Sequence, residues 1–230
     1  MNKNKILVIS LLLLVVICFG IYKLTNNSSS NDSDKNNKAQ ESLDKSSVSD
    51  KEKDDNSSNN KILVVYFSKT GENYNVGVVD VGNTAMMASY IVDYLNADSF
   101  EIVPVKKYSD NYQKSTEEAK KEQNENARPE IKNKLNNLSD YDTIFIGYPI
   151  WWGDLPMIVY TFLESYDFSG KTIIPFNTHE GSGSASTYAI IKNKLTNSNV
   201  NTNGLAIQGS VARSDDGKTK TIEWLKELGY

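Results

Sequence analysis

The chain has 230 residues, of which 39% are hydrophobic and 23% are charged, and its formal net charge is −4. Because no cluster of lysine and arginine is interleaved with aromatic residues, the sequence lacks the charge pattern of a nucleic-acid-binding protein. The only cysteine is Cys18 and the only histidine is His179. This composition excludes a disulfide framework, a multi-histidine or thiolate metal site and, in the part of the chain after Cys18, a cysteine nucleophile.

The first 24 residues are the most apolar part of the chain. The run Ile6–Tyr22 is broken only by one serine and one glycine, and as a helix it would span about 25 Å, close to the thickness of a membrane's hydrocarbon core. Two lysines precede it, which favours a cytoplasmic amino terminus. We expect residues 1–24 to be an uncleaved signal anchor. A cleaved signal peptide, or a lipoprotein signal ending at Cys18, remains open.

Residues 25–60 are almost entirely polar and contain only Ala39, Leu43 and Val48 as apolar side chains. Such a segment buries too little apolar surface to offset the entropy of ordering, so a disordered linker is expected. As a flexible coil it would have an end-to-end distance of about 30–35 Å. The sequence therefore predicts a membrane-anchored or lipoprotein-like protein, with its domain on the extracytoplasmic side of a bacterial membrane.

Residues 61–230 have the length of a single globular domain. Apolar runs typical of buried parallel strands alternate with segments of helical periodicity. Strands are expected at 61–67, 99–105, 143–148, 171–178 and 204–210. Helices are expected at 85–95, 110–125, 128–135, 155–166, 184–194 and 216–228. Pro104 favours an edge position for the second strand, and Asp154 is the expected N-cap of the helix at 155–166. The pattern predicts an α/β fold, with a five-stranded parallel sheet covered by helices on both faces.

Ligands of such folds bind at the carboxyl ends of the strands, and the loop after the first strand has features of a phosphate site. Ser68, Thr70 and Thr84 offer hydroxyl groups, and the last of these lies at the start of a helix, where unpaired N–H groups attract anions. The loop contains neither GxxxxGK[ST] nor GxGxxG, so a nucleotide-triphosphate loop and a Rossmann dinucleotide site are not supported. A helix cap followed by a plain surface turn is the alternative.

Two further loops are expected to lie beside the first. The loop after the strand at 143–148 carries Trp151 and Trp152, which either pack on the edge of the domain or stack on a flat ligand. The glycine-rich loop after the strand at 171–178 carries His179, a candidate for proton transfer and equally a simple contact residue.

The sequence resembles the flavodoxin-like proteins that bind FMN, above all the group related to NAD(P)H:quinone and flavin oxidoreductases. The resemblance rests on three motifs. The first is VVYFSKTG, which continues after an interruption with GNT; the others are GYPIWWGDLP and PFNTHEGSGS. The resemblance covers essentially all of residues 61–230. It implies a flavodoxin-like three-layer sandwich and FMN as the cofactor. The residues that it assigns to FMN binding are Ser68, Thr70, Gly71, Asn83, Thr84, Pro149, Ile150, Trp151, Trp152, Gly153, Thr178, His179, Gly181, Ser182 and Gly183.

The resemblance leaves three functions open. The first is an FMN oxidoreductase that passes electrons from a reduced donor to a quinone, flavin or similar small acceptor. The second is a one-electron carrier for a protein partner, and the third is a flavin-binding domain without turnover. Glu180 stands where relatives often have a small residue, so the charge near the flavin differs from theirs. A homodimer is left open, because related quinone reductases often complete their site with a second subunit.

The first loop matches the flavodoxin pattern only if the eleven residues Glu72–Gly82 are an insertion. Their valines and the central Asn75 and Gly77 are typical of a short hairpin. We expect this hairpin to project beside the FMN site and to shape access to it, with Tyr74 as a candidate contact. A surface elaboration packed on the edge of the sheet is the alternative.

Overall fold

The computed structural model describes residues 60–230. The expected anchor at 1–24 and nearly all of the expected linker at 25–60 lie outside the described residues and stay predictions. Within residues 60–230, no helix is both long enough and apolar enough to cross a membrane.

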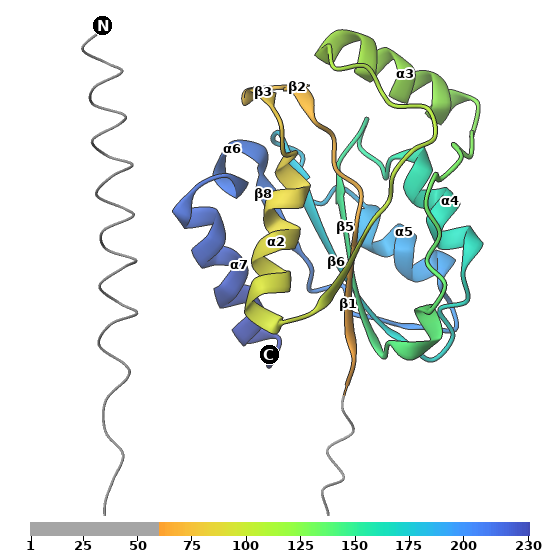
Figure 1. Ribbon diagram of the computed structural model, residues 1–230, viewed down its shortest axis with the longest axis vertical. Coiled ribbons are helices and arrows are strands. Elements are labelled where there is room, and N and C mark those ends of the chain that lie inside the picture. The colour runs from red at the N-terminus through yellow and green to blue at the C-terminus, as the bar shows by residue number, and fades with distance from the viewer. Residues whose placement is uncertain (1–59) are drawn as a thin grey trace, which may run out of the picture. The chain divides into compact units, whose positions relative to one another are not determined.

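The domain is built on a parallel sheet with the strand order β4-β1-β5-β6-β7, in which β8 also pairs with β6 (Figure 1). The strands are β1 (Ile62–Tyr66), β4 (Asp98–Glu101), β5 (Thr143–Pro149), β6 (Thr172–His179), β7 (Asn199–Val200) and β8 (Leu205–Gln208). β7 pairs with the beginning of β6 and β8 with its end, both in parallel. Because β5 occupies the other side of β6, β7 and β8 together fill the fifth strand position. The expected α/β fold with a parallel sheet of about five strands is confirmed, and β4 lies at the edge.

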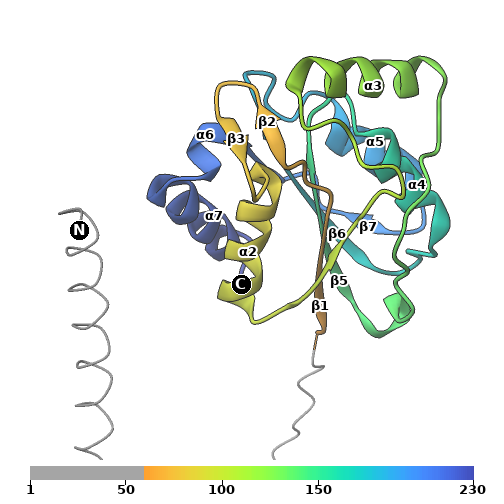
Figure 2. The same ribbon diagram turned by 45° about the horizontal axis from the view of Figure 1, so that its top comes forward.

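The helices cover the sheet in two layers, with α2 and α7 on one face and α4 and α5 on the other (Figures 1 and 2). Their bounds are α2 (Asn83–Leu95), α3 (Tyr112–Asn124), α4 (Met157–Ser165), α5 (Thr187–Lys194), α6 (Gly209–Ala212) and α7 (Asp215–Glu227), with a 3₁₀ turn η1 at Leu138–Asp140. Strand side chains alternate between the layers, as the pleat requires. Ile144 and Ile146 of β5 pack towards α4 and α5, while Phe145 packs towards α2 and α7.

Two sequence predictions about local structure are wrong. Residues 128–135 form no helix, because the segment runs antiparallel beside the chain that follows β4: Pro104 and Ile131 form a bridge, and Val105 N–H donates to Glu130 C=O at 2.9 Å. Asp154 is not the N-cap of α4, which begins at Met157 after Pro156. Asp154 Oδ1 instead accepts hydrogen bonds from Leu155 N–H at 2.7 Å and from Tyr160 O–H at 2.8 Å.

A surface ion cluster ties the segment after α3 to α4 and α5. The carboxylate of Glu164 accepts from Arg128 Nε and from Lys194 Nζ, each at 2.6 Å. Arg128 and then Lys194 lower the pKa of Glu164 to about 2. The cluster thus holds the beginning of the segment 128–135, for which a helix was wrongly predicted, against α4 and α5.

The inserted residues form a separate antiparallel hairpin, as the sequence predicts. Its strands are β2 (Gly71–Asn73) and β3 (Gly77–Val79). Asn75 and Gly77 at the turn have φ values of 56° and 89°, a region that asparagine and glycine adopt most readily. The hairpin stands at the end of the domain where α3 also lies, beyond the carboxyl ends of the central strands (Figures 1 and 2).

Helix α3 differs from the helices that cover the sheet. It buries only Ser115 and Ala119, and most of its other side chains are charged or amide groups. In both views it lies above the strand ends and not against a face of the sheet (Figures 1 and 2). Helix α3 therefore lies at the edge of the sheet where ligands are expected to bind.

Candidate functional site

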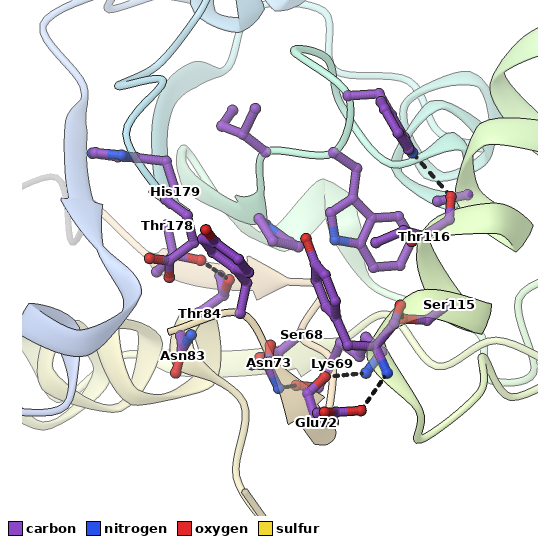
Figure 3. Close-up of a pocket in the computed structure, with 18 residues that line it drawn as sticks. Ser68, Lys69, Glu72, Asn73, Asn83, Thr84, Ser115, Thr116, Thr178 and His179 are labelled. Carbon is purple, nitrogen blue, oxygen red and sulfur yellow. Dashed lines mark hydrogen bonds between the residues drawn. The ribbon is translucent and has the colours of Figure 1, made fainter. Parts of the chain in front are cut away.

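A cavity of about 430 Å³ opens at the carboxyl ends of β1, β5 and β6. It brings together nine of the residues expected from the sequence, and Figure 3 shows several of them around it. The nine are Ser68, Asn83, Thr84, Pro149, Ile150, Trp151, Trp152, Thr178 and His179. Thr70, Gly71, Gly153, Gly181, Ser182 and Gly183 lie in the same loops but are not among the lining residues.

The first loop and the beginning of α2 form a polar end of the cavity. Ser68 Oγ accepts a hydrogen bond from Ala85 N–H at 3.0 Å, so that a side chain upstream of the insertion caps the helix downstream of it. Thr84 and Thr178 share a hydrogen bond between their hydroxyl oxygens at 2.8 Å. A side chain at Gly82 would collide with Ser68 Oγ. The two halves of the split loop therefore meet in space, and the hairpin bulges out between them.

Lys69 lines the cavity beside this polar end, and its side chain is engaged with the backbone. Its Nζ donates to Thr70 C=O at 3.1 Å and to Glu72 C=O at 2.9 Å. Burial lowers the pKa of Lys69, and the neighbouring carboxylates of Asp110 and Glu72 oppose this shift. Lys69 thus holds the base of the hairpin closed beside the polar end.

The second loop places its two tryptophans in different surroundings. Trp151 is packed edge-on against Phe67, with ring centroids 5.3 Å apart, and against Tyr108, at 4.9 Å. Trp152 is 55% exposed and has a positive φ of 52°. Its Nε1 donates to Thr116 C=O of α3 at 2.9 Å (Figure 3). Packing therefore accounts for Trp151, whereas Trp152 is exposed and is held to α3 by this hydrogen bond and by Lys120 Nζ, which lies 5.1 Å from the centre of its ring.

His179 is the last residue of β6 and lines the cavity where the third loop begins. Its Nδ1 accepts a hydrogen bond from Gly181 N–H at 2.9 Å, so Nδ1 carries no proton in this arrangement. Burial also lowers the pKa of His179 below its ordinary value of 6.5. The imidazole is therefore neutral at pH 7 and carries its proton on Nε2.

Glu180 follows His179 and also lines the cavity. Its carboxylate lies near the backbone N–H of Gly209 and the side chain of Asn75, and burial is the main cause of its raised pKa. Within residues 60–230, its Oε2 is buried without a hydrogen-bond partner. A carboxylate oxygen of this kind can accept a bond from a ligand donor. Glu180 therefore lies between the third loop and the tip of the hairpin.

The hairpin lies beside the cavity, as expected from the sequence, whereas the wall formed by α3 was not expected. The missed lining residues are Lys69, Glu72, Asn73, Tyr112, Ser115, Thr116 and Ala119. Tyr74, expected as a candidate contact, lines the cavity as well. The available signal was the spacing of Ser115 and Ala119, two small residues one helical turn apart in a charged segment. Among the described residues, no group of three or more His, Cys, Asp or Glu side chains is arranged to hold a metal ion.

Comparison with known proteins identifies the family. The flavodoxin family model matches residues 61–227. A flavoprotein structure from Bacteroides eggerthii is 30% identical, with a TM-score of 0.59, and the match covers 74% of this chain and 98% of that one. One from Bacteroides uniformis is 31% identical, with a TM-score of 0.58 and coverage of 72% and 97%.

A flavoprotein of Lactobacillus acidophilus, solved in complex with FMN, shares the fold at 23% identity and a TM-score of 0.52, over 66% of this chain and 95% of that one. No curated protein matches the sequence. Because the family model spans most of the chain, the protein belongs to the flavodoxin family, whose cofactor is FMN.

Proposed function

We propose that the domain is an FMN-dependent oxidoreductase that passes electrons from a reduced donor to a quinone, flavin or similar small acceptor. The observation that carries the proposal is the cavity of about 430 Å³, which has a hydroxyl-lined end at the start of a helix and aromatic walls at its mouth. FMN has the same division, with an anionic phosphate at one end and a flat ring at the other. The residues present therefore fit the cofactor.

The polar end suits the phosphate group. Ser68, Asn83 and Thr84 line the cavity there, and the first N–H groups of α2 carry partial positive charge. Lys69 adds a cation beside them, although its Nζ is held by backbone carbonyls. The loop thus binds an anion mainly through neutral donors and the helix terminus.

The second and third loops suit the ring. Trp151 and Trp152 would cover apolar ring surface and exclude water. Thr178 and neutral His179 offer hydrogen-bonding groups to the polar edge of the ring, and Glu180 places a carboxylate beside them. A negative charge close to the ring disfavours an anionic reduced form, so Glu180 would lower the reduction potential.

When bound, reduced FMN would supply the two electrons and two protons that the reduction of a quinone to a hydroquinone requires. The protein residues bind, orient and shield the cofactor. Because His179 is neutral and its Nδ1 is engaged by Gly181 N–H, proton transfer by this side chain is not part of the proposal.

The test uses the full-length protein purified in detergent. Titration with FMN, followed by flavin fluorescence and by the visible spectrum, should show binding at micromolar concentration or tighter. The photoreduced complex, mixed without oxygen with 2-methyl-1,4-naphthoquinone, should be reoxidised as hydroquinone forms. A complex that reacts quickly only with a one-electron acceptor protein, and is reduced in two separate one-electron steps, would show a carrier. Protein that stays colourless with FMN would overturn the flavin-based function.

We also propose that the domain works on the extracytoplasmic side of a bacterial membrane, on the basis of the apolar residues 1–24 and the polar residues 25–60. Protease treatment of intact cells should then release the domain into the medium. A domain that is protected until the cells are lysed would contradict this location.

A further inference from the structure

Three exposed aromatic side chains gather at the mouth of the cavity. They are Tyr74, Tyr112 and Trp152, which are 51%, 38% and 55% exposed, and all three line the cavity. They come from three places in the chain: the turn of the inserted hairpin, the first residue of α3 and the second loop. Aromatic rings left in water lose the stabilisation that burial gives them. A ligand that covers them would recover it.

The two tyrosines form a pair with a defined geometry. Their ring centroids are 5.6 Å apart and their planes are inclined by 32°. Neither residue belongs to the three loops that resemble the FMN-binding motifs. Tyr74 lies within the insertion that separates the two halves of the phosphate loop, and Tyr112 opens a helix that stands above the strand ends (Figure 2).

Hydrogen bonds between the hairpin, which carries Tyr74, and the beginning of α3, which carries Tyr112, hold the pair in place. Glu72 Oε2 accepts hydrogen bonds from Tyr112 N–H at 2.8 Å and from Asn111 Nδ2 at 3.1 Å. The backbone N–H of Glu72 donates to Asp110 C=O at 2.7 Å. The hairpin is therefore fastened to the beginning of α3 by a carboxylate at a helix N-terminus, where it is favoured. Surfaces fixed before binding lose less entropy when a ligand arrives.

The charges around the pair indicate which ring it suits. Glu72, Glu180 and Lys69 all line this cavity. The ammonium of Lys69 is engaged by two backbone carbonyls, so the two carboxylates disfavour an anionic ligand beside the pair. Burial, followed by Tyr74 and Glu180, raises the pKa of Tyr112, so its hydroxyl stays protonated at neutral pH and can donate to a carbonyl oxygen. A flat, uncharged ring that carries carbonyl groups matches these features.

We propose that Tyr74 and Tyr112 form an acceptor subsite that stacks on an uncharged quinone, beside the FMN held by the three loops. This inference rests on the proposed oxidoreductase function. The quinone takes up two electrons and two protons from the reduced cofactor and leaves as a hydroquinone. The inserted hairpin thereby determines which acceptors react.

The test measures how the reoxidation rate of the photoreduced full-length protein depends on the concentration of 2-methyl-1,4-naphthoquinone. In Tyr74→Ala/Tyr112→Ala, the half-saturating quinone concentration should rise about 10-fold, the magnitude expected for losing aromatic stacking. The affinity for FMN, measured by fluorescence, should stay within about 2-fold of the wild type, because the three loops are intact. The discrimination between naphthoquinone and the smaller benzoquinone should shrink, since less ring surface is recognised.

Two further variants separate stacking from general damage. Tyr74→Phe/Tyr112→Phe retains both rings and should keep the half-saturating concentration near that of the wild type. Tyr94→Ala removes a tyrosine of α2 that is 39% exposed and does not line the cavity, and it should change neither quantity.

Three results would overturn the subsite. One is an unchanged half-saturating concentration in the double alanine variant. Another is a loss of FMN affinity by a similar factor with no change in quinone dependence, which would show that the rings stack on the cofactor. The third is wild-type protein that binds FMN but reduces no quinone, which overturns the proposed oxidoreductase function as well. The first two results leave that function standing.

Discussion

The fastening of the hairpin to α3 by Glu72 gives a prediction that does not depend on any ligand. Glu72→Ala removes two hydrogen bonds to the beginning of α3, at 2.8 and 3.1 Å. Both are exposed to solvent, so each contributes about 0.5–1 kcal/mol, and the charge at the helix N-terminus adds a few tenths more. The sum is about 1–2 kcal/mol, which corresponds to about a 5–30-fold change in an opening equilibrium. The loss should be local, because α3 buries only two side chains.

Hydrogen exchange measured by mass spectrometry tests this reasoning. Peptides covering 71–82 and 112–124 should lose protection by about 5–30-fold in Glu72→Ala, while peptides from β5 and β6 stay unchanged. Asp216→Ala is the matched control, since it removes an exposed carboxylate whose ion pair within residues 60–230 is with Lys220, one turn along α7. Unchanged protection in the hairpin, or an equal loss of protection in β5 and β6, would refute the conclusion that Glu72 locally stabilises the contact between the hairpin and α3.

The remaining predictions concern the phosphate loop and two carboxylates. Gly82→Ala should weaken FMN binding by about 10-fold or more in fluorescence titrations, because the new Cβ collides with Ser68 Oγ. Gly170→Ala strains the backbone at a φ of 75° but meets no atom within 4 Å and does not line the cavity, so it should lower stability and leave the FMN affinity of the folded protein unchanged. Since the pKa of Glu164 is lowered from 4.5 to about 2, its stabilisation is present above pH 4.5 and is lost as the pH falls towards 2. Glu164→Gln should remove less than about 1 kcal/mol of this pH-dependent stability in denaturant titrations. Burial raises the pKa of Glu180, so Glu180→Gln should make the apoprotein more stable at pH 7, and this gain should vanish below pH 4.5. Equal gains at pH 7 and pH 4 in denaturant titrations would contradict it.

The layers of the fold follow directly from the sequence, because strands buried on both faces read as continuous apolar runs. Ile144, Phe145 and Ile146 are all fully buried. The hairpin was equally predictable, since Asn75 and Gly77 supply the positive φ values of its turn. Both the layers and the hairpin depend on the residue types within short segments, so they can be predicted from a single sequence.

The errors arise where distant contacts override the local pattern. Residues 128–135 have helical periodicity, yet Asn133 accepts from Val103 N–H at 3.1 Å and donates to Glu101 C=O at 2.7 Å. These bonds draw the segment along the chain after β4, about 30 residues upstream. No local preference indicates such a partner.

The missed cavity wall has a similar cause. The charged residues of α3 are typical of a helix exposed to solvent on most sides, and this is how α3 is built. What the sequence did not reveal is that Ser115, Thr116 and Ala119 line a cavity. That placement depends on Glu72 and Trp152, which bind α3 from two other loops.

In the split phosphate loop, the residues that form the polar end of the cavity are separate from the residues of the hairpin beside it. Ser68 and Thr84 are held by Ala85 and Thr178, and these contacts do not involve the hairpin between them. The hairpin can consequently change in length and in side chains without removing these two contacts at the polar end.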